Sequence, residues 1–224
     1  MKHAGRARRA ALKLIFLTLA GAAILGAIAM MVQFQPQAVS IVLAALWAAF
    51  TLFTFYFFRD PDARTPGNPG VILSPGHGTV DCIDKLEQSD FPGGPCHRIS
   101  IFLSVLNVHV QCAPVSGMIC RVAHTDGNYI SALNADSAKF NENVLIGFDS
   151  AEVPGEKIGV RLIAGVLARR IIPFVKAGDQ MARGERISLI QFGSRCDVYI
   201  PLSYAIKVKL QDPVVGGETI LAAK

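Results

Sequence analysis

The sequence predicts a mainly β protein, in which a compact sandwich-like or barrel-like domain follows an N-terminal membrane hairpin of two apolar helices. Two observations support this prediction. No charged residue occurs from position 14 to position 58, and beyond position 70 the apolar runs are short, rich in Val and Ile, and interrupted by Gly, Pro, Asn or Asp. A hydrophobic content of 51% and a mean hydropathy of +0.40 are high for a soluble domain.

The uncharged stretch divides at Gln33-Phe34-Gln35-Pro36-Gln37 into two apolar blocks, residues 14–32 and 38–58. Each block approaches the roughly 20 residues that a helix needs to span a bilayer. A secretory signal peptide is the alternative for the first block, because Ala27-Ile28-Ala29 resembles a cleavage site. The length of that block and the second block directly after it favour the hairpin. A buried core hairpin is disfavoured, since a small domain does not bury so long an apolar stretch in one place.

Positive charge flanks the two blocks, and the loop between them has no cation. The positive-inside rule therefore places both ends in the cytoplasm, at the inner face of the cell membrane. The net charge of +5 favours an anionic lipid surface. No nucleic-acid partner is expected, because no basic stripe with interleaved aromatic residues follows. The flanking cations are Lys2, Arg6, Arg8, Arg9, Lys13, Arg59 and Arg64.

Residues 59–70 are polar and rich in Pro and Gly, which is typical of a linker. The predicted domains are therefore a membrane hairpin (1–58), a linker (59–70) and a β-rich domain (71–224). A short helix around residues 163–170 is compatible with the small and basic residues there. The predicted strands are 71–73, 79–83, 99–103, 108–110, 118–122, 144–148, 158–164, 187–191, 196–200 and 205–210.

The five cysteines form no Cys-x-x-Cys pair, and an odd number leaves at least one unpaired. We expect reduced thiols in a cytoplasmic domain. A zinc site is the alternative, but the ligand spacing matches no standard pattern, so no metal is predicted. The soft ligands that such a site would draw on are Cys82, Cys96, His97, Cys112, Cys120 and His124.

Three stretches place Gly directly before a predicted strand, as tight hairpins require: "SPGHGTV" at 74–80, "APVSGMI" at 113–119 and "KAGDQMARGERI" at 176–187. The last of these, continued by "SLIQFGSRCDVYIP", resembles the hairpins of lipoyl and biotinyl carrier domains. No lysine stands at the hairpin tip where those carriers attach their cofactor. The resemblance therefore indicates lipoyl-like hairpins in the fold only.

Gly193-Ser194 joins two strand-like runs, and most such pairs are simple turns. A serine in a strained turn can also attack the preceding carbonyl if a base stands near. The resulting ester can undergo β-elimination, which leaves one chain ending at Gly193 and another beginning with a pyruvoyl group. That electrophilic carbonyl can act as an electron sink for an amino acid substrate.

Six stretches in order decide between these interpretations: "FFRDPDARTP" at 57–66, "SPGHGTV" at 74–80, "ISIFLSVLNVHVQCAPVSG" at 99–117, "NADSAKFNEN" at 134–143, "IAGVLARRI" at 163–171 and "LIQFGSRCDVYIP" at 189–201. Together they resemble the short bacterial type of phosphatidylserine decarboxylase proenzyme. The resemblance covers the chain from about residue 57 to the C-terminus, and the apolar hairpin also stands where that family has one.

The resemblance implies autocatalytic cleavage between Gly193 and Ser194. Residues 1–193 would form a membrane-bound β chain, and residues 194–224 an α chain that begins with the covalent pyruvoyl cofactor. In the family, this carbonyl forms a Schiff base with phosphatidylserine, CO2 leaves, and phosphatidylethanolamine is released. The expected partners are phosphatidylserine in the membrane and the two cleaved chains as a heterodimer, with a higher oligomer also open.

His109 stands where the family has a histidine implicated in self-cleavage or decarboxylation, although a packed structural histidine is the alternative. His77 departs from the family pattern, which has an aspartate here in a Ser-His-Asp arrangement. His77 could act as the base itself, or Asp81 or Asp84 could take the missing role. Cleavage could also be slow or lost. A second departure, Gln111-Cys112 in place of Asn-Arg, removes a cation.

Polar residues in two of the matched stretches are candidates for substrate binding. A guanidinium can hold the lipid phosphate or the serine carboxylate bidentately, although a solvent-facing ion pair is an equal interpretation. The second stretch lies near the substrate pocket in relatives, and its alternative is a solvated loop. The candidates are Arg169 and Arg170 in the first, and Asn134, Asp136, Lys139 and Asn143 in the second. The competing function is a homologue that has lost processing and serves as a lipid-binding or scaffold module.

Overall fold

The computed structural model describes residues 2–31, 37–89, 91–130, 140–165, 170–191 and 194–224. Two compact units make up these residues. One comprises residues 5–60, and the other comprises residues 61–224 together with residues 2–4. The first is an α-helical hairpin and the second is the β-rich domain, so the predicted fold class is confirmed.

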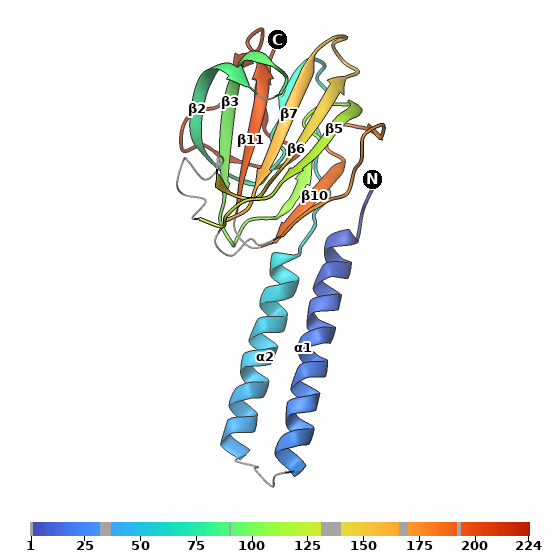
Figure 1. Cartoon of the computed structure of the whole chain (residues 1–224), viewed down its shortest axis with the longest axis vertical. Helices are drawn as coiled ribbons and strands as arrows, with labels where there is room; N and C mark the ends of the chain where they lie inside the picture. Colours follow the sequence, from blue (N-terminus) through green and yellow to red (C-terminus); the bar gives the residue numbers. More distant parts are fainter. Residues whose placement is uncertain (1, 32–36, 90, 131–139, 166–169, 192–193) are drawn as a thin grey trace. The chain divides into compact units, whose positions relative to one another are not determined.

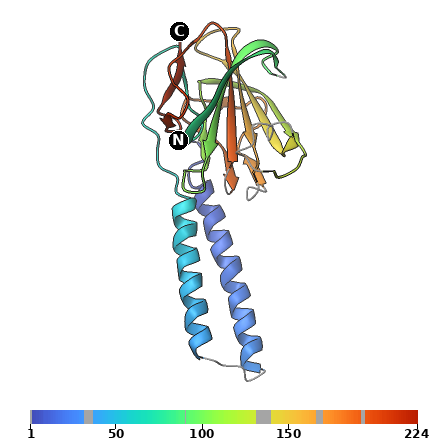
Figure 2. The same ribbon diagram turned by 90° about the vertical axis from the view of Figure 1, so that its left-hand side faces the viewer.

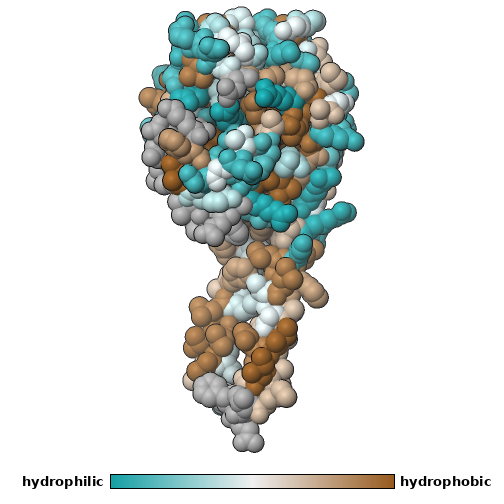
Figure 3. All heavy atoms as spheres, viewed as in Figure 1, coloured by the Kyte–Doolittle hydropathy of each residue, from teal (hydrophilic) through white to brown (hydrophobic). Residues whose placement is uncertain are grey.

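The helical unit consists of α1 (Arg6–Met31) and α2 (Gln37–Phe57). Both helices are long and apolar enough to cross a membrane. Their large side chains face outward rather than into a protein core, as Leu25 (69% exposed) and Leu52 (72% exposed) illustrate. The space-filling view shows the same contrast between the apolar helices and the polar surface of the β-rich unit (Figure 3). This exposure argues against a buried core hairpin. Within the hairpin, Trp47 Nε1 donates to Thr18 Oγ1 at 3.3 Å.

The β-rich unit contains three sheets, of which the largest is strongly curled (Figures 1 and 2). Its strand order is β13-β2-β3-β11-β7-β6-β5-β9, and the two small sheets have the orders β1-β14-β12 and β4-β10-β8. The strands are β1 (Val71–Leu73), β2 (Gly78–Ser89), β3 (Gly94–Leu103), β4 (Val110–Cys112), β5 (Gly117–Thr125), β6 (Asn143–Ser150), β7 (Lys157–Ile163), β8 (Arg170–Pro173), β9 (Gln180–Met181), β10 (Arg186–Gln191), β11 (Ser194–Pro201), β12 (Ala205–Ile206), β13 (Pro213–Val214) and β14 (Ile220–Ala223).

One hydrophobic core lies inside the curled sheet, and all three sheets contribute to it. Successive side chains of a strand point to opposite faces, so alternate residues of β11 enter the core. Its members include Ile72 of β1, Ile146 of β6, Ile190 of β10, Val198 of β11 and Leu221 of β14. Burial of such Val, Leu and Ile side chains stabilises the fold by about 1.5–3 kcal/mol each.

A smaller cluster covers part of the outer face of the same sheet. Phe91, at the tip of the β2–β3 hairpin, packs there with Leu145 and Tyr199. Its ring lies on Gly147, where a Cβ would come within 2.6 Å of Phe91 Cζ. A side chain at position 147 would therefore force the hairpin tip away from the sheet.

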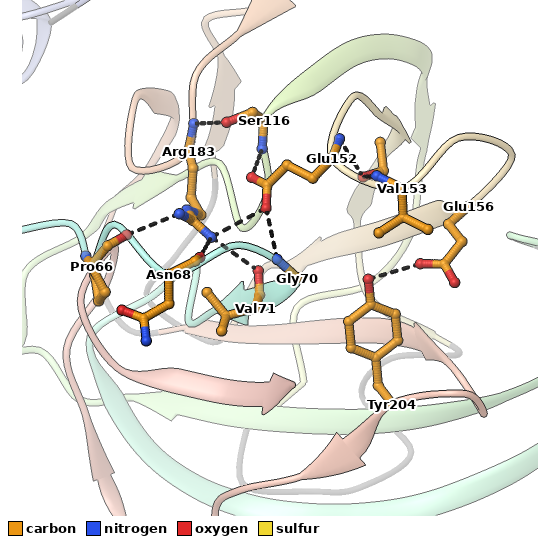
Figure 4. Close-up of polar contacts among 11 residues, drawn as sticks. Pro66, Asn68, Gly70, Val71, Ser116, Glu152, Val153, Glu156, Arg183 and Tyr204 are labelled. Atoms are coloured by element: carbon orange, nitrogen blue, oxygen red, sulfur yellow. Dashed lines mark hydrogen bonds and ion pairs between the residues drawn. The ribbon is translucent and has the colours of Figure 1, made fainter. Parts of the chain in front are cut away.

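Arg183 holds the end of the linker, residues 66–70, where it leads into β1 (Figure 4). Arg183 donates from Nη2 to the Pro66 carbonyl at 2.9 Å and from Nη1 to the Asn68 carbonyl at 2.8 Å. Its partner carboxylate, Glu152, lies 3.3 Å away and also accepts from the Gly70 amide. Residues 66–70 are thus held through their main chain, and these contacts do not depend on the linker side chains.

The short helix expected around residues 163–170 is not seen in the described part of that segment. Ile163 ends β7 and Arg170 begins β8, while residues 166–169 lie outside the described residues. Pairing of these two ends with β11 and β10 provides their main-chain hydrogen bonds, which a helix would otherwise supply.

Candidate active site

Ser194 is the first residue of β11 and follows the point where the chain passes from a small sheet to the large one. Gln191 ends β10 in the small sheet, and residues 192 and 193 lie outside the described residues. Ser194 is fully buried and pairs in register with Leu103 of β3. Its Oγ has no hydrogen-bond partner among the described residues. A buried hydroxyl without a partner costs free energy, so this oxygen calls for an explanation beyond that of an ordinary turn.

His109 is fully buried just before β4. Its Nδ1 lies 2.9 Å from the main-chain oxygen of Asn107. A carbonyl oxygen can only accept, so Nδ1 carries the proton and Nε2 is the nitrogen left to act as a base. The turn is fixed in its own right, because the Asn107 side chain accepts from both the amide and the hydroxyl of Ser104 at 2.8 Å.

The main chain of His109 is tied to the strand that leads to Ser194. Its carbonyl accepts from the Ile190 amide at 3.0 Å and from Gln111 Nε2 at 2.8 Å. Gln111 is fully buried and accepts in turn from Ser188 Oγ at 2.8 Å. The Gln111 side chain therefore supports the main chain of His109.

His77 lies in the turn between β1 and β2 and is half-buried. Its ring packs on Gly216, where a Cβ would come 3.0 Å from His77 Cδ2. The turn is bound to the strand after His109, because the Cys112 amide donates to the Pro75 carbonyl at 2.8 Å. The turn also lies near the Leu103 side chain, since a Cβ at Gly76 would come 3.5 Å from Leu103 Cδ1. The structure thus brings the His77 turn to both the strand paired with Ser194 and the strand that follows His109.

Asp81 and Asp84, the two carboxylates considered as stand-ins for the missing aspartate, both form ion pairs. Asp84 binds Arg98, with Nε–Oδ1 at 3.0 Å and Nη2–Oδ2 at 2.5 Å. Asp81 Oδ2 lies 2.5 Å from Arg195 Nη2. Burial raises the pKa of Asp81, and the charge of Arg195 opposes that shift. Each carboxylate is thus already engaged with a guanidinium.

A third carboxylate joins these pairs. Asp197 of β11 is fully buried, and its Oδ1 lies 3.7 Å from Arg195 Nε. Burial raises its pKa, while the Ser100 hydroxyl and the charges of Arg98, Arg195 and Arg161 act in the opposite direction. Neighbouring strands β2, β3 and β11 therefore share a partly buried acid–arginine cluster, which we define as Asp81, Asp84, Arg98, Arg195 and Asp197.

The described candidates for substrate binding lie at two places. Arg170 is exposed and pairs in register with Gln191, next to the predicted cleavage point. Asn143 is buried at the start of β6, where its Nδ2 donates to the Asn141 carbonyl at 3.0 Å. The other candidates, Arg169, Asn134, Asp136 and Lys139, lie outside the described residues, as does Gly193.

Asn141 was not singled out by sequence reasoning. Its side chain is 1% exposed and bonds to the main chain on both sides: Nδ2 donates to the carbonyls of Ile130 (2.8 Å) and Ala164 (2.7 Å), and Oδ1 accepts from the Ile130 amide (2.9 Å). The sequence could have indicated Asn141 through its position in the matched stretch 134–143, but so polar a stretch is also typical of a solvated loop.

Among the described residues, no three His, Cys, Asp or Glu side chains could hold a metal ion. None of the five cysteines, all of which lie in the described part of the chain, forms a disulfide.

Comparison with known proteins bears on this site. A family model described as "Phosphatidylserine decarboxylase" matches residues 50–222. The chain belongs to the phosphatidylserine decarboxylase family. Three relatives are each named "Phosphatidylserine decarboxylase proenzyme". The protein of Desulfotalea psychrophila is 39% identical over 180 residues, which cover 80% of this chain and 83% of the relative. That of Ruegeria pomeroyi is 37% identical over 195 residues (83% and 88%), and that of Pelobacter propionicus is 38% identical over 178 residues (80% of each).

Membership of the phosphatidylserine decarboxylase family confirms the resemblance drawn from the six stretches and makes this an enzyme family. The matched region contains Ser194, His109 and His77. The roles of these residues and of the substrate-binding candidates stay predictions, for which the geometry above provides the basis.

Proposed function

We propose that this chain is a self-processing phosphatidylserine decarboxylase, which cuts its own backbone between Gly193 and Ser194 and then converts phosphatidylserine to phosphatidylethanolamine. The observation that carries the proposal is the buried Ser194 Oγ, which has no hydrogen-bond partner among the described residues. A hydroxyl kept unbonded in this way is available as a nucleophile. The printed names of the relatives, which are proenzymes, support the same interpretation.

In the proposed cleavage, Ser194 Oγ bonds to the carbonyl carbon of Gly193 and gives its proton to a base. The C–N bond between the two residues then breaks, the nitrogen takes up a proton, and an ester remains. Removal of the Cα proton of residue 194 expels the Gly193 carboxylate. The unsaturated residue left behind takes up water and releases ammonia, which leaves a pyruvoyl group at the new N-terminus.

His109 Nε2 is the proposed base for Ser194. The hydrogen bond from Nδ1 to Asn107 leaves Nε2 free of its proton in the neutral ring, and a histidine changes charge near neutral pH. His77 occupies the position of the family aspartate. As a neutral ring it can orient a neighbouring imidazole but can supply only part of the stabilisation that a carboxylate gives an imidazolium.

The residues present fit a pyruvoyl group at position 194, because Ser194 supplies its atoms and lies in a site closed to water. Once formed, the group supplies an electrophilic carbonyl that accepts the electron pair released when CO2 leaves. We assign the lipid phosphate or the serine carboxylate to Arg170, which is exposed beside Gln191. The remaining candidates are proposed to complete the substrate site: Arg169, Asn134, Lys139 and Asn143.

The proposed setting is the inner face of the cell membrane, where the substrate resides. The two exposed apolar helices would hold the β-rich unit at the bilayer, and the flanking cations favour a cytoplasmic location for that unit. Cleavage would yield a heterodimer of residues 1–193 and 194–224.

Intact-mass spectrometry of the purified wild-type chain beside Ser194→Ala tests the proposal. We expect two wild-type fragments, the smaller one beginning at residue 194 with the mass of pyruvoyl instead of serine, and one uncut mutant chain. The same preparations are then given phosphatidylserine, and only the wild type should release CO2. An uncut wild-type chain would overturn the proposal.

A second candidate function is favoured by His77, which stands where the family has an aspartate. In this alternative, the chain is a homologue that keeps the fold, lacks processing and serves as a lipid-binding or scaffold module. This alternative predicts a single chain whose behaviour does not change in Ser194→Ala. Formation of phosphatidylethanolamine that depends on Ser194 would exclude it.

A further inference from the structure

Arg195 follows Ser194 directly, and its guanidinium connects β11 to β2 across the intervening strand β3. Nη2 lies 2.5 Å from Oδ2 of Asp81, and Nε lies 3.7 Å from Oδ1 of Asp197. The exposed fraction is 4% for the Arg195 side chain and 21% for that of Asp81. An ion pair with so little solvent around it restrains the residues that carry it, because breaking it would leave a buried charge without compensation.

The ion pair lies on the face of the sheet opposite to the face that carries the Ser194 side chain. Cys196 and Val198 of β11 belong to the hydrophobic core, so Arg195 and Asp197 point to the opposite face. By the same alternation, Ser194 shares the face of Cys196. Arg195 can therefore restrain the backbone next to position 194 from the face opposite to the Ser194 side chain.

After the proposed cleavage, the ion pair between Arg195 and Asp81 would join two separate chains. Before the cut, residue 194 is held by covalent bonds on both sides. After the cut it is the free end of a strand, and strand ends are among the least stable parts of a fold. Arg195 then belongs to the new chain, whereas Asp81 belongs to residues 1–193.

We propose that Arg195 is a positioning residue for decarboxylation: its ion pair with Asp81 keeps the carbonyl at position 194 in place beside Leu103. This inference rests on the proposed function, since it concerns the chain end that cleavage creates. It concerns the rate of the decarboxylation step and not the formation of the pyruvoyl group. A carbonyl that drifts by about 1 Å from its productive position loses rate steeply, by up to about 100-fold.

Asp81→Asn tests the inference, because it removes the charge of the partner and leaves the size of its side chain nearly unchanged. The matched control is Glu152→Gln, which breaks another largely buried ion pair of the same unit. Glu152 lies 3.3 Å from Arg183, with exposed side-chain fractions of 19% and 10% (Figure 4). Both of these residues belong to residues 1–193, so their ion pair does not join the two cleaved chains.

For each variant, the pyruvoyl content of the purified full-length protein is measured by mass spectrometry, and kcat and KM for phosphatidylserine in detergent micelles are expressed per pyruvoyl group. We expect kcat of Asp81→Asn to fall about tenfold with KM within about twofold of the wild type. Glu152→Gln should keep both constants within about twofold. Equal kcat values per pyruvoyl group in the two variants would overturn the inference.

If Asp81→Asn does not fold or does not mature, Arg195→Lys tests the inference instead. Its kcat per pyruvoyl group is compared with that of Glu152→Gln. Lysine keeps the charge but cannot meet Asp81 and Asp197 from two separate nitrogens. A fall in kcat at unchanged KM supports the positioning role, and a kcat equal to that of Glu152→Gln contradicts it. Absence of pyruvoyl from the wild type would instead refute the proposed function, so the two failures are distinguishable.

Discussion

Ser194 and His109 are both fully buried, yet they reach their positions by different means. Ser194 is placed by the ladder of β11 with β3, which is long and regular. His109 lies outside any strand and is held by hydrogen bonds to its ring and to its carbonyl. A base that is fixed through its own main chain and one ring nitrogen has a defined orientation, and its second nitrogen is the only one left for proton transfer.

Replacing His109 by Gln should slow chain cleavage by about 100-fold or more, because Gln can still donate to the Asn107 carbonyl but cannot take a proton near neutral pH. The measurement is the fraction of cleaved chain against time on a denaturing gel. His97→Gln is the control, since His97 lies on β3 opposite Ile200 and away from this turn. Cleavage of His109→Gln at the wild-type rate would show that another group acts as the base.

Restoring an aspartate by His77→Asp should accelerate cleavage by several-fold, roughly 3–10-fold, because a carboxylate stabilises an adjacent imidazolium better than a neutral ring does. The shorter side chain also relieves the close packing on Gly216. The same gel assay measures the effect, and Gly216→Ala, which would crowd the His77 ring, provides the opposite perturbation. Slower cleavage in His77→Asp would mean that His77 itself participates.

At the scale of elements, strands that coincide with a clear Val- and Ile-rich run were predictable, including the three-residue β1, whereas several other short strands were not. β1 (Val71–Leu73) has the bounds that the apolar run predicts, and β6 and β10 extend the predicted cores by few residues. β8, β9, β13 and β14 have only two to four residues each, too few for a period to be recognised. The run at 205–210 alternates apolar residues with lysines and so predicts a longer strand than β12, which is limited to Ala205–Ile206 by its partner.

Some features of the candidate site could likewise be predicted from the sequence, and others could not. Ser194 and His109 stand in matched stretches, so the family resemblance could single them out. The ion pair between Asp81 and Arg195 joins residues 114 positions apart. Only the pairing of β2 and β11 with the same strand brings them together, and no local pattern encodes that register. Asn141 was missed for the related reason that its partners, Ile130 and Ala164, are distant in sequence.

Glu156, in the loop before β7, should make stability depend on pH. Burial alone would raise its pKa, but hydrogen bonds from Lys224 and Tyr204 outweigh that effect and lower the pKa below its ordinary value of 4.5. A lowered pKa in the folded state means that the carboxylate contributes stability above pH 4.5, and that this contribution is lost as the pH falls through the folded-state pKa.

We therefore expect the melting temperature of the wild type to fall more steeply than that of Glu156→Gln between about pH 6 and about pH 3.5. Each kcal/mol lost corresponds to about 2–4 °C for a chain of this size. Thermal scans of the detergent-solubilised full-length proteins provide the measurement. Parallel curves for the two proteins would contradict the assignment.

At the scale of the whole molecule, the helical hairpin should make the full-length chain an integral membrane protein. An apolar span of about 20 residues resists extraction by alkaline carbonate, whereas a protein held by charge alone is released. We expect the chain to remain in the pellet after such extraction, with a cytoplasmic soluble protein as control. Its appearance in the supernatant would refute the membrane assignment.

Proteolysis of sealed membrane vesicles tests which side of the membrane carries the β-rich unit. Protease added to inside-out vesicles should degrade the β-rich unit, and right-side-out vesicles should protect it, because the positive-inside rule, applied to the cations that flank the helices, predicts a cytoplasmic location for that unit. The opposite pattern would reverse the topology.

The place of β11 within the large sheet has a consequence for how maturation can be observed. This strand lies between β3 and β7, and the later strands β13 and β14 pair with β2 and β1. A cut before Ser194 would thus assign an interior strand and two further pairings to the smaller fragment. Dilution cannot release such a fragment, since its departure would require the sheet to come apart. The mature and immature forms should therefore have the same size in native chromatography and separate only after denaturation.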